Sequence, residues 1–128
     1  MSCNELDLNN SADGTRCAAV EVGFDYSLNV LYKDSSGSAI DLTGGTIQMI
    51  VKDSLDVTLL TLNHVVDRLL TGIFINSLAG GDFDIQISDV DTVTVGVGVA
   101  KYRVTFTDSV GLKHRISYGS LSFIDGAA

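Results

Sequence analysis

The chain has no proline, no tryptophan and only two cysteines among its 128 residues. Without proline, its strands lack one common protection against pairing with strands of other chains. The lack of tryptophan weakens the case for an aromatic platform that binds sugars. A domain of this length buries roughly two thirds of the surface that its unfolded chain exposes, so we expect one domain that folds without a disulfide or a metal.

Long apolar runs and basic residues are also scarce. No apolar run approaches the roughly 18 residues that a membrane span needs, and residues 1–7 lack the basic and apolar regions of a secretory signal. Sixteen acidic residues outnumber eight basic ones, which gives a net charge of −8. This balance argues against nucleic acid, whose binding proteins carry basic patches, and against an anionic membrane surface.

The two cysteines, Cys3 and Cys17, both lie close to the N-terminus. They are either free thiols in a flexible or pairing segment, or candidates for a disulfide within the chain or between subunits. A disulfide that closes a loop of this size stabilises a protein by about 3 kcal/mol in the chain-entropy model. Two cysteines without a nearby histidine supply only half of a tetrahedral metal site. We therefore divide the chain into an N-terminal extension or pairing strand, residues 1–20, and one β-sandwich domain, residues 21–128.

Alternation of apolar and polar residues with a period of two is the dominant pattern. It occurs in segments 24–32, 47–51, 83–87, 102–106 and 116–118, and it is typical of strands with one buried face. Short apolar stretches in 57–62, 65–66 and 72–75 add further strands. Gly, Asp and Ser cluster in the breaks at 33–38, 42–45, 78–82 and 107–111, as in turns. The sequence predicts an all-β fold, an immunoglobulin-like antiparallel β-sandwich of about 7–8 strands.

Evidence for helix is confined to residues 88–93. Ser88 could cap a helix there, and Asp91 would then occupy the third helical position. The neighbouring valines and threonine are β-branched and lower helix propensity. We expect at most one short helical turn, which crosses between the two sheets.

Residues able to perform chemistry are few and scattered. Neither His64 nor His114 has a serine or cysteine partner that its spacing would place nearby, so we interpret both as satisfied or solvent-facing histidines. Asp82 and Asp84 share one face of a strand and invite a calcium interpretation, yet the surrounding sequence lacks a calcium-loop pattern. Because Phe83 and its alternating partners need the core, we assign these aspartates to the solvated face. The sequence predicts no enzyme, no cofactor and no metal site.

The segments follow one another in a recognisable order. In residues 24–44 a strand is followed by an Asp34-x-x-Gly37 hairpin and an Ile40-Asp-Leu-Thr-Gly44 corner, and the next strand spans 46–53. Strands at 82–88, 101–108 and 114–123 follow, with the helical turn at 89–94. Across residues 20–124 this order is similar to the N-terminal domain of phage upper baseplate proteins and of related tail or fibre-attachment proteins. The chain departs from the family at residues 95–98, where relatives usually continue into Leu-Pro-x-Gly.

The resemblance implies a non-enzymatic structural protein of a tailed-bacteriophage virion, in the baseplate, tail or fibre attachment. Such a protein would be assembled in the bacterial host cytoplasm and would contact other virion proteins, and we expect a homo-oligomer. Segment 1–20 could add as a strand to a neighbouring sheet. Two alternatives stay open: a capsid decoration protein, and a carbohydrate-binding module that recognises a host-surface glycan through exposed aromatic residues. Nucleic acid and membrane are not expected as partners.

Overall fold

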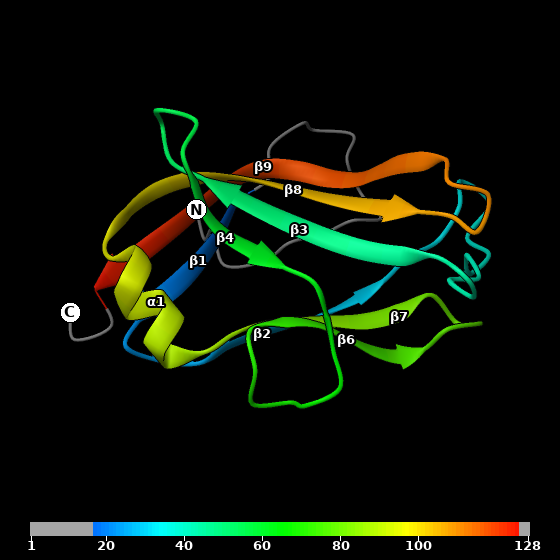
Figure 1. The fold of residues 1–128 in the computed structure, drawn as a ribbon, viewed down its shortest axis with the longest axis horizontal. Coiled ribbons are helices and arrows are strands. Elements are labelled where there is room, and N and C mark those ends of the chain that lie inside the picture. Colours follow the sequence, from blue (N-terminus) through cyan, green and yellow to red (C-terminus); the bar gives the residue numbers. More distant parts are fainter. Residues whose placement is uncertain (1–16, 126–128) are drawn as a thin grey trace.

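The computed structural model describes residues 17–125, which form two packed β-sheets and one short helix (Figure 1). Sheet A has the strand order β1 (Cys17–Val22), β9 (Lys113–Asp125), β8 (Gly98–Thr107), β3 (Thr46–Lys52) and β4 (Thr58–Leu62). Sheet B has the order β2 (Tyr26–Leu31), β7 (Asp82–Ile87), β6 (Gly72–Ser77) and β5 (His64–Val65). Helix α1 (Asp89–Val95) connects sheet B to sheet A. The predicted all-β sandwich is confirmed.

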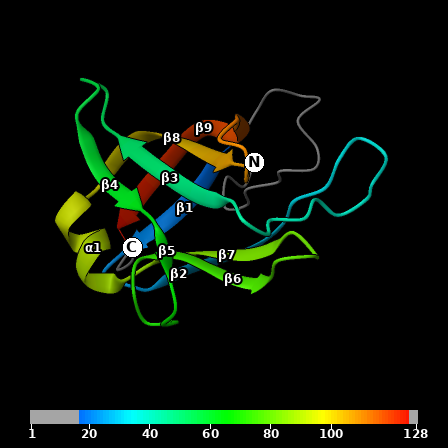
Figure 2. The ribbon, with the colours of Figure 1, turned by 45° about the vertical axis from the view of Figure 1, so that its right-hand side comes forward.

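The order of the strands is that of an immunoglobulin-like sandwich. In sheet B, β2, β7 and β6 take the places of strands B, E and D, and in sheet A, β3, β8 and β9 take those of C, F and G. The segment between β2 and β3 carries the chain from one sheet to the other and projects from the end of the sandwich (Figure 2). The described part contains nine strands, slightly more than expected, because the chain also forms the short strand β5.

The core lies between the two sheets and is built from alternate side chains of almost every strand. Leu42, from the corner before β3, is 1% exposed and closes one end of it. The fully or nearly fully buried apolar residues are Val20, Val30, Leu42, Ile47, Met49, Val51, Leu62, Ile73, Phe83, Ile85, Ile87, Ala100, Tyr102, Val104, Phe106, Leu121 and Phe123. The alternation predicted for β3 and β8 is therefore confirmed, and in β7 the predicted apolar residues Phe83, Ile85 and Ile87 are buried.

Strand β1 runs parallel to β9 and forms one edge of sheet A. Cys17 begins this strand opposite Ser120, and Val20 is completely buried. The expected boundary between residues 20 and 21 falls inside β1, so residues 17–20 pair within their own chain. The remainder of the predicted N-terminal extension, with Cys3, lies outside the described residues, and its pairing with a neighbouring sheet stays a prediction.

A bulge in the β8–β9 pair reverses the alternation in β9. Val104 pairs with Ser117, but the next residue of β8 pairs with Arg115, which leaves Ile116 as the extra residue. Beyond the bulge Ser117 is 6% exposed and Tyr118 is 61% exposed. The sequence predicted that Ile116 and Tyr118 face the core together, and this is wrong for Tyr118 because one extra residue exchanges the two faces of a strand.

Helix α1 begins where the sequence predicted it. Ser88 is the N-cap, and its hydroxyl accepts a hydrogen bond from the Asp91 N–H. The helix has seven residues, about two turns, and so exceeds the single turn expected. Thr92 supports it, because its buried hydroxyl donates to the Asp89 carbonyl and accepts from the Gly23 N–H. These contacts offset the low helix propensity of the valines.

Three five-residue loops share one hydrogen-bond pattern: 34–38, 53–57 and 108–112. In each, the first residue is an aspartate whose carboxylate accepts from the backbone N–H groups two and four residues further on. The fourth residue has a positive φ; it is glycine in two loops and Asp56, at 67°, in the third. The turn chemistry predicted at 33–38 and 107–111 is thus confirmed.

The outer face of sheet B is covered by the chain itself. Segment 66–71, between β5 and β6, loops over this face (Figure 1), and the Gln86 side chain of β7 donates to the carbonyls of Asp67 at 3.2 Å and Leu70 at 3.0 Å. Gln86 is 5% exposed and Asp84 is 7% exposed. The assignment of Asp84 to a solvated face is therefore wrong, because the crossing segment removes the water that the alternation implied.

Asp84 is the acceptor at the centre of this polar cluster. Its Oδ1 accepts from the amides of Asn29 at 2.8 Å and Asn76 at 2.9 Å, and its Oδ2 pairs with Arg68 Nη1 at 2.7 Å. The second guanidinium nitrogen of Arg68 donates to the Asn76 oxygen, and the group lies 4.0 Å over the Phe74 ring centre. The donors and acceptors of this cluster are paired with one another. The cluster therefore stabilises the fold and is not an open binding site.

The pKa of Asp84 lies below its usual value. Burial acts to raise this pKa, but hydrogen bonds from Asn29, Arg68 and Asn76, together with the Arg68 charge, outweigh burial. A carboxyl with a lowered folded-state pKa stabilises the fold above the unfolded pKa of about 3.9. This contribution is lost as the pH falls through the folded-state pKa.

We predict that Asp84→Asn lowers the free energy of unfolding by about 1–3 kcal/mol at neutral pH, because Arg68 and two amides lose a charged acceptor. The difference from the wild type should narrow as the pH falls below about 4. Urea denaturation at a series of acidic pH values measures this difference in the free energy of unfolding. Asp56→Asn, at an exposed aspartate, is the control and should change little. A pH-independent loss in Asp84→Asn would contradict this role.

A second prediction concerns the loop 108–112. Gly111 has φ 90°, and a Cβ there would meet no atom within 4 Å. Gly111→Ala should therefore lower the free energy of unfolding by about 1–2 kcal/mol through backbone strain alone. Gly111→Asn should cost less, because asparagine tolerates this region. Equal losses in urea denaturation of the two variants would rule out strain as the cause.

Candidate functional site

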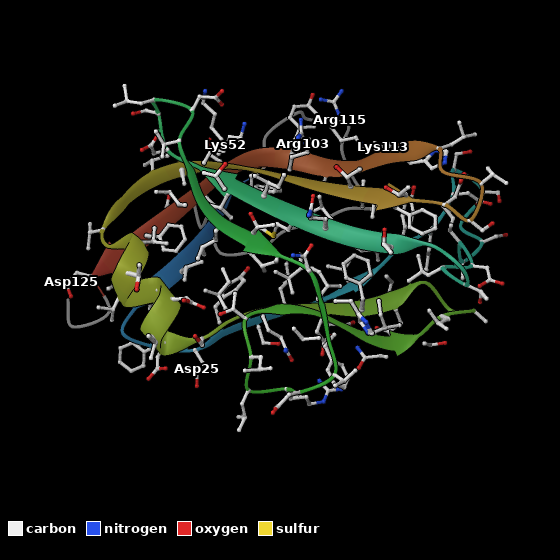
Figure 3. All side chains as sticks on the ribbon, in the orientation of Figure 1. Asp25, Lys52, Arg103, Lys113, Arg115 and Asp125 are labelled. Carbon is white, nitrogen blue, oxygen red and sulfur yellow. The ribbon has the colours of Figure 1, made fainter. Side chains whose placement is uncertain are left out.

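The outer face of sheet A is bare of any crossing segment of the described chain and carries most of its basic side chains. Burial of Ile47, Met49 and Val51 in β3 turns the residues between them outward, and the same alternation applies to β8. Of the eight Lys and Arg residues in the chain, five lie on this surface: Lys52, Lys101, Arg103, Lys113 and Arg115. We call these five residues the basic face. Figure 3 shows four of them along the side of sheet A that points away from sheet B.

The register places the five charges in four successive rows across β3, β8 and β9. Lys52 lies opposite Lys101 in the first row, and Arg103 lies between Ile50 and Tyr118 in the next. In the third row Arg115 lies opposite Thr105, and in the fourth Lys113 lies opposite Thr107. Successive rows on one face are about 6.7 Å apart, so positive charge extends for roughly 20 Å along the sheet.

Few carboxylates neutralise this charge. Strands β3, β4 and β8 and residues 113–124 of β9 contain no Asp or Glu. Within the described residues, the one ion pair on the basic face joins Lys52 Nζ to Asp56 Oδ1 at 3.4 Å, across largely exposed side chains. The Lys52–Lys101 pair places like charges directly opposite each other, which destabilises a sheet. The basic face therefore carries a local charge arrangement that opposes folding.

The basic face also has shape and an aromatic component. A shallow hollow of about 400 Å³ lies over it, lined by Gln48, Ile50, Arg103, Thr105, Thr107, Lys113 and Arg115. The Arg115 guanidinium lies 4.5 Å over the ring centre of Tyr118. This cation–π contact holds two long side chains side by side at the margin of the hollow. Arginine and tyrosine are among the residue types enriched at binding hot spots of protein interfaces.

No protein-family model matches this chain, and no curated relative matches it either. The likeness of residues 20–124 to phage upper baseplate proteins therefore stays a prediction from the sequence. The basic face is described by its own chemistry: it can attract carboxylates or other anions, stack against planar groups and accept apolar contact at Ile50 and Tyr118.

The histidines singled out in the sequence lie apart from one another. His114 pairs with Asp108 through Nε2 and Oδ2 at 2.9 Å and stacks on Phe106. The hydrogen bond from His114 is the largest of the effects that lower the pKa of Asp108. His64 is exposed at the rim of an apolar groove of about 460 Å³ between the sheets, lined in part by Leu42 and Ile73. Neither arrangement brings a nucleophile to a base.

Two absences hold for the part of the chain that the structure describes. In residues 17–125 no group of three or more His, Cys, Asp or Glu is placed to hold a metal ion. No described helix is long and apolar enough to cross a membrane. Cys17 lies at the start of β1, and Cys3 lies outside the described residues, so their disulfide or interface role stays a prediction.

The basic face was missed because the net charge of the whole chain was used to judge its partners. A local signal was available in the sequence: Lys101-Tyr-Arg103 and Lys113-His-Arg115 each place two bases at i and i+2. Residues two apart in a strand share a face. What the sequence did not reveal is that β8 and β9 are adjacent, which merges the two pairs into one surface.

We predict that Lys101→Glu raises the free energy of unfolding by about 0.5–1 kcal/mol at low salt, because it replaces a like-charge pair with an opposite-charge pair. The gain should fall near 1 M salt, where the screening length is about 3 Å. Thermal or urea unfolding measures both. Lys33→Glu makes the same change of charge outside the basic face and should show no such gain. A loss of stability in Lys101→Glu would contradict repulsion on the face.

Proposed function

We propose that this protein is a non-catalytic structural component of a tailed-bacteriophage particle and assembles through the outer face of sheet A. The observation that carries the proposal is the basic face: five bases, of which Lys52 pairs with Asp56, on an open sheet of a chain with a net charge of −8. The order of strands and turns that resembles phage upper baseplate proteins supports the virion setting.

The contrast between the two sheets supports a binding role for one of them. Segment 66–71 and the hydrogen-bonded cluster around Asp84 cover the outer face of sheet B. Sheet A presents charged residues, Ile50 and Tyr118 without such a cover among the described residues. A protein partner with carboxylates around an apolar centre would satisfy both components, since interfaces combine a desolvated centre with a polar rim.

A glycan partner is less well supported. Binding of sugar on a flat protein surface would call for several exposed aromatic rings together. Of the exposed large aromatic residues in the described chain, Tyr118 is on the basic face and Phe24 lies before β2 beside helix α1. The surface is better suited to an acidic protein than to a neutral sugar.

The proposal predicts that the protein is present in purified phage particles at a fixed copy number. Particles assembled in cells that supply Arg103→Glu/Arg115→Glu should incorporate at least about tenfold less of the chain, which corresponds to about 1.4 kcal/mol. Quantitative mass spectrometry of the particles measures this. Lys33→Glu is the control for charge and should be incorporated normally.

Three results would count against the proposal. Absence of the wild-type chain from the particles would reject the virion role. Normal incorporation of Arg103→Glu/Arg115→Glu would reject the basic face as the contact. Tight binding of the wild type to a glycan array, lost in the double variant, would favour the carbohydrate-binding alternative.

A further inference from the structure

The end of the sandwich that carries α1 has the opposite character to the basic face. Glu21 of β1, Asp25 and Asp89 are all exposed there. Asp25 lies against the helix, because its Oδ1 accepts the Asp89 N–H at 2.8 Å. Figure 3 shows Asp25 beside α1, away from the labelled bases of sheet A. Three exposed carboxylates are thus near one another at this end, although other acidic residues, among them Asp34 and Asp108, lie in loops elsewhere.

The same end exposes apolar side chains. Val90 and Val93 of α1 are 69% and 59% exposed, whereas the helix buries Thr92 completely. Phe24 is 54% exposed, and its carbonyl accepts from the Thr92 hydroxyl, so the residue lies next to the helix. An amphipathic surface helix normally turns its apolar side to the core. In this helix Val95 packs against the core, but Val90 and Val93 remain exposed on its outer side.

We call Glu21, Phe24, Asp25, Asp89, Val90 and Val93 the acidic end. It and the basic face are complementary in both components: carboxylates match Lys and Arg, and the exposed Phe and Val match Ile50 and Tyr118. We infer that the acidic end of one copy docks on the basic face of a second copy of this chain. This inference rests on the proposed assembly function and names the partner in it.

The charges also exclude one symmetrical form of the contact. Two basic faces cannot meet across a twofold axis, because like charges would lie opposite one another over four rows. Docking of an end on a flank joins two different surfaces, and it is heterologous when the flank of the first copy is left free for the end of a third. Such a contact repeats from copy to copy and closes into a ring, or continues as a filament, depending on its rotation.

The size of the basic face predicts that one contact alone is weak. Four rows by three strands cover roughly 300 Å² at ordinary strand spacings, against about 800 Å² per partner in a stable complex. Closure of a ring makes the last contact intramolecular and stabilises the whole. The fraction of associated chains should therefore rise steeply with protein concentration. Association should weaken as the salt concentration increases.

The test compares two variants of the full chain by sedimentation equilibrium at low salt. Arg103→Glu/Arg115→Glu reverses the face, and Glu21→Lys/Val93→Lys reverses charge at the end, where lysine is also a better helix former than valine. Each should weaken self-association at least about tenfold, whereas Lys33→Glu should leave it unchanged. An equimolar mixture of the two double variants should associate more tightly than either alone, because each supplies the surface that the other needs.

Circular dichroism melting of each variant checks that the fold is retained. A wild type that stays monomeric at high concentration and low salt would overturn the inference, even if the chain is found in particles. Loss of association with the face variant but not with the end variant would overturn the role of the acidic end. Binding of wild-type monomer to an oligonucleotide or heparin, without self-association, would assign the basic face to a polyanion instead.

Discussion

The structure depends on the pleat of the β-strand, which sends neighbouring side chains to opposite faces of a sheet. In β8 the core takes Ala100, Tyr102, Val104 and Phe106. The residues between them, among them Lys101 and Arg103, then have no other direction than outward. The core and the basic face are therefore two consequences of one register, and a one-residue shift in this strand would exchange them.

The bulge at Ile116 shows what happens to the two faces of a strand when its register shifts by one residue. One extra residue in β9 places Ser117 inside, where its hydroxyl lies 3.3 Å from the hydroxyl of Tyr102. It also places Tyr118 outside, beneath Arg115. Bulges often redirect side chains at sites of function. Here the bulge supplies the basic face with its aromatic residue.

The outer faces of the two sheets differ in whether their polar and charged side chains are buried or exposed. In sheet B, a crossing segment buries polar groups, and Asp84 is stabilised by the donors that surround it. In sheet A, like charges remain in the open at some cost in stability. Natural proteins retain such locally unfavourable residues where they serve binding. The acidic end adds a second locally unfavourable feature, a helix with two exposed valines.

The amino-acid sequence by itself determined the fold class, because the apolar–polar sequence pattern of β3, β7 and β8 and the Asp-led loops are local and need no partner to be recognised. It also determined the start of α1 at Ser88, since capping depends on residues within one turn. The tertiary structure alone decided the rest. Asp84 is buried because segment 66–71 crosses it, and Tyr118 is exposed because of a register shift against another strand. The bases of β3, β8 and β9 form one surface because these strands are neighbours in space, and pairing between distant segments leaves no mark on either segment alone.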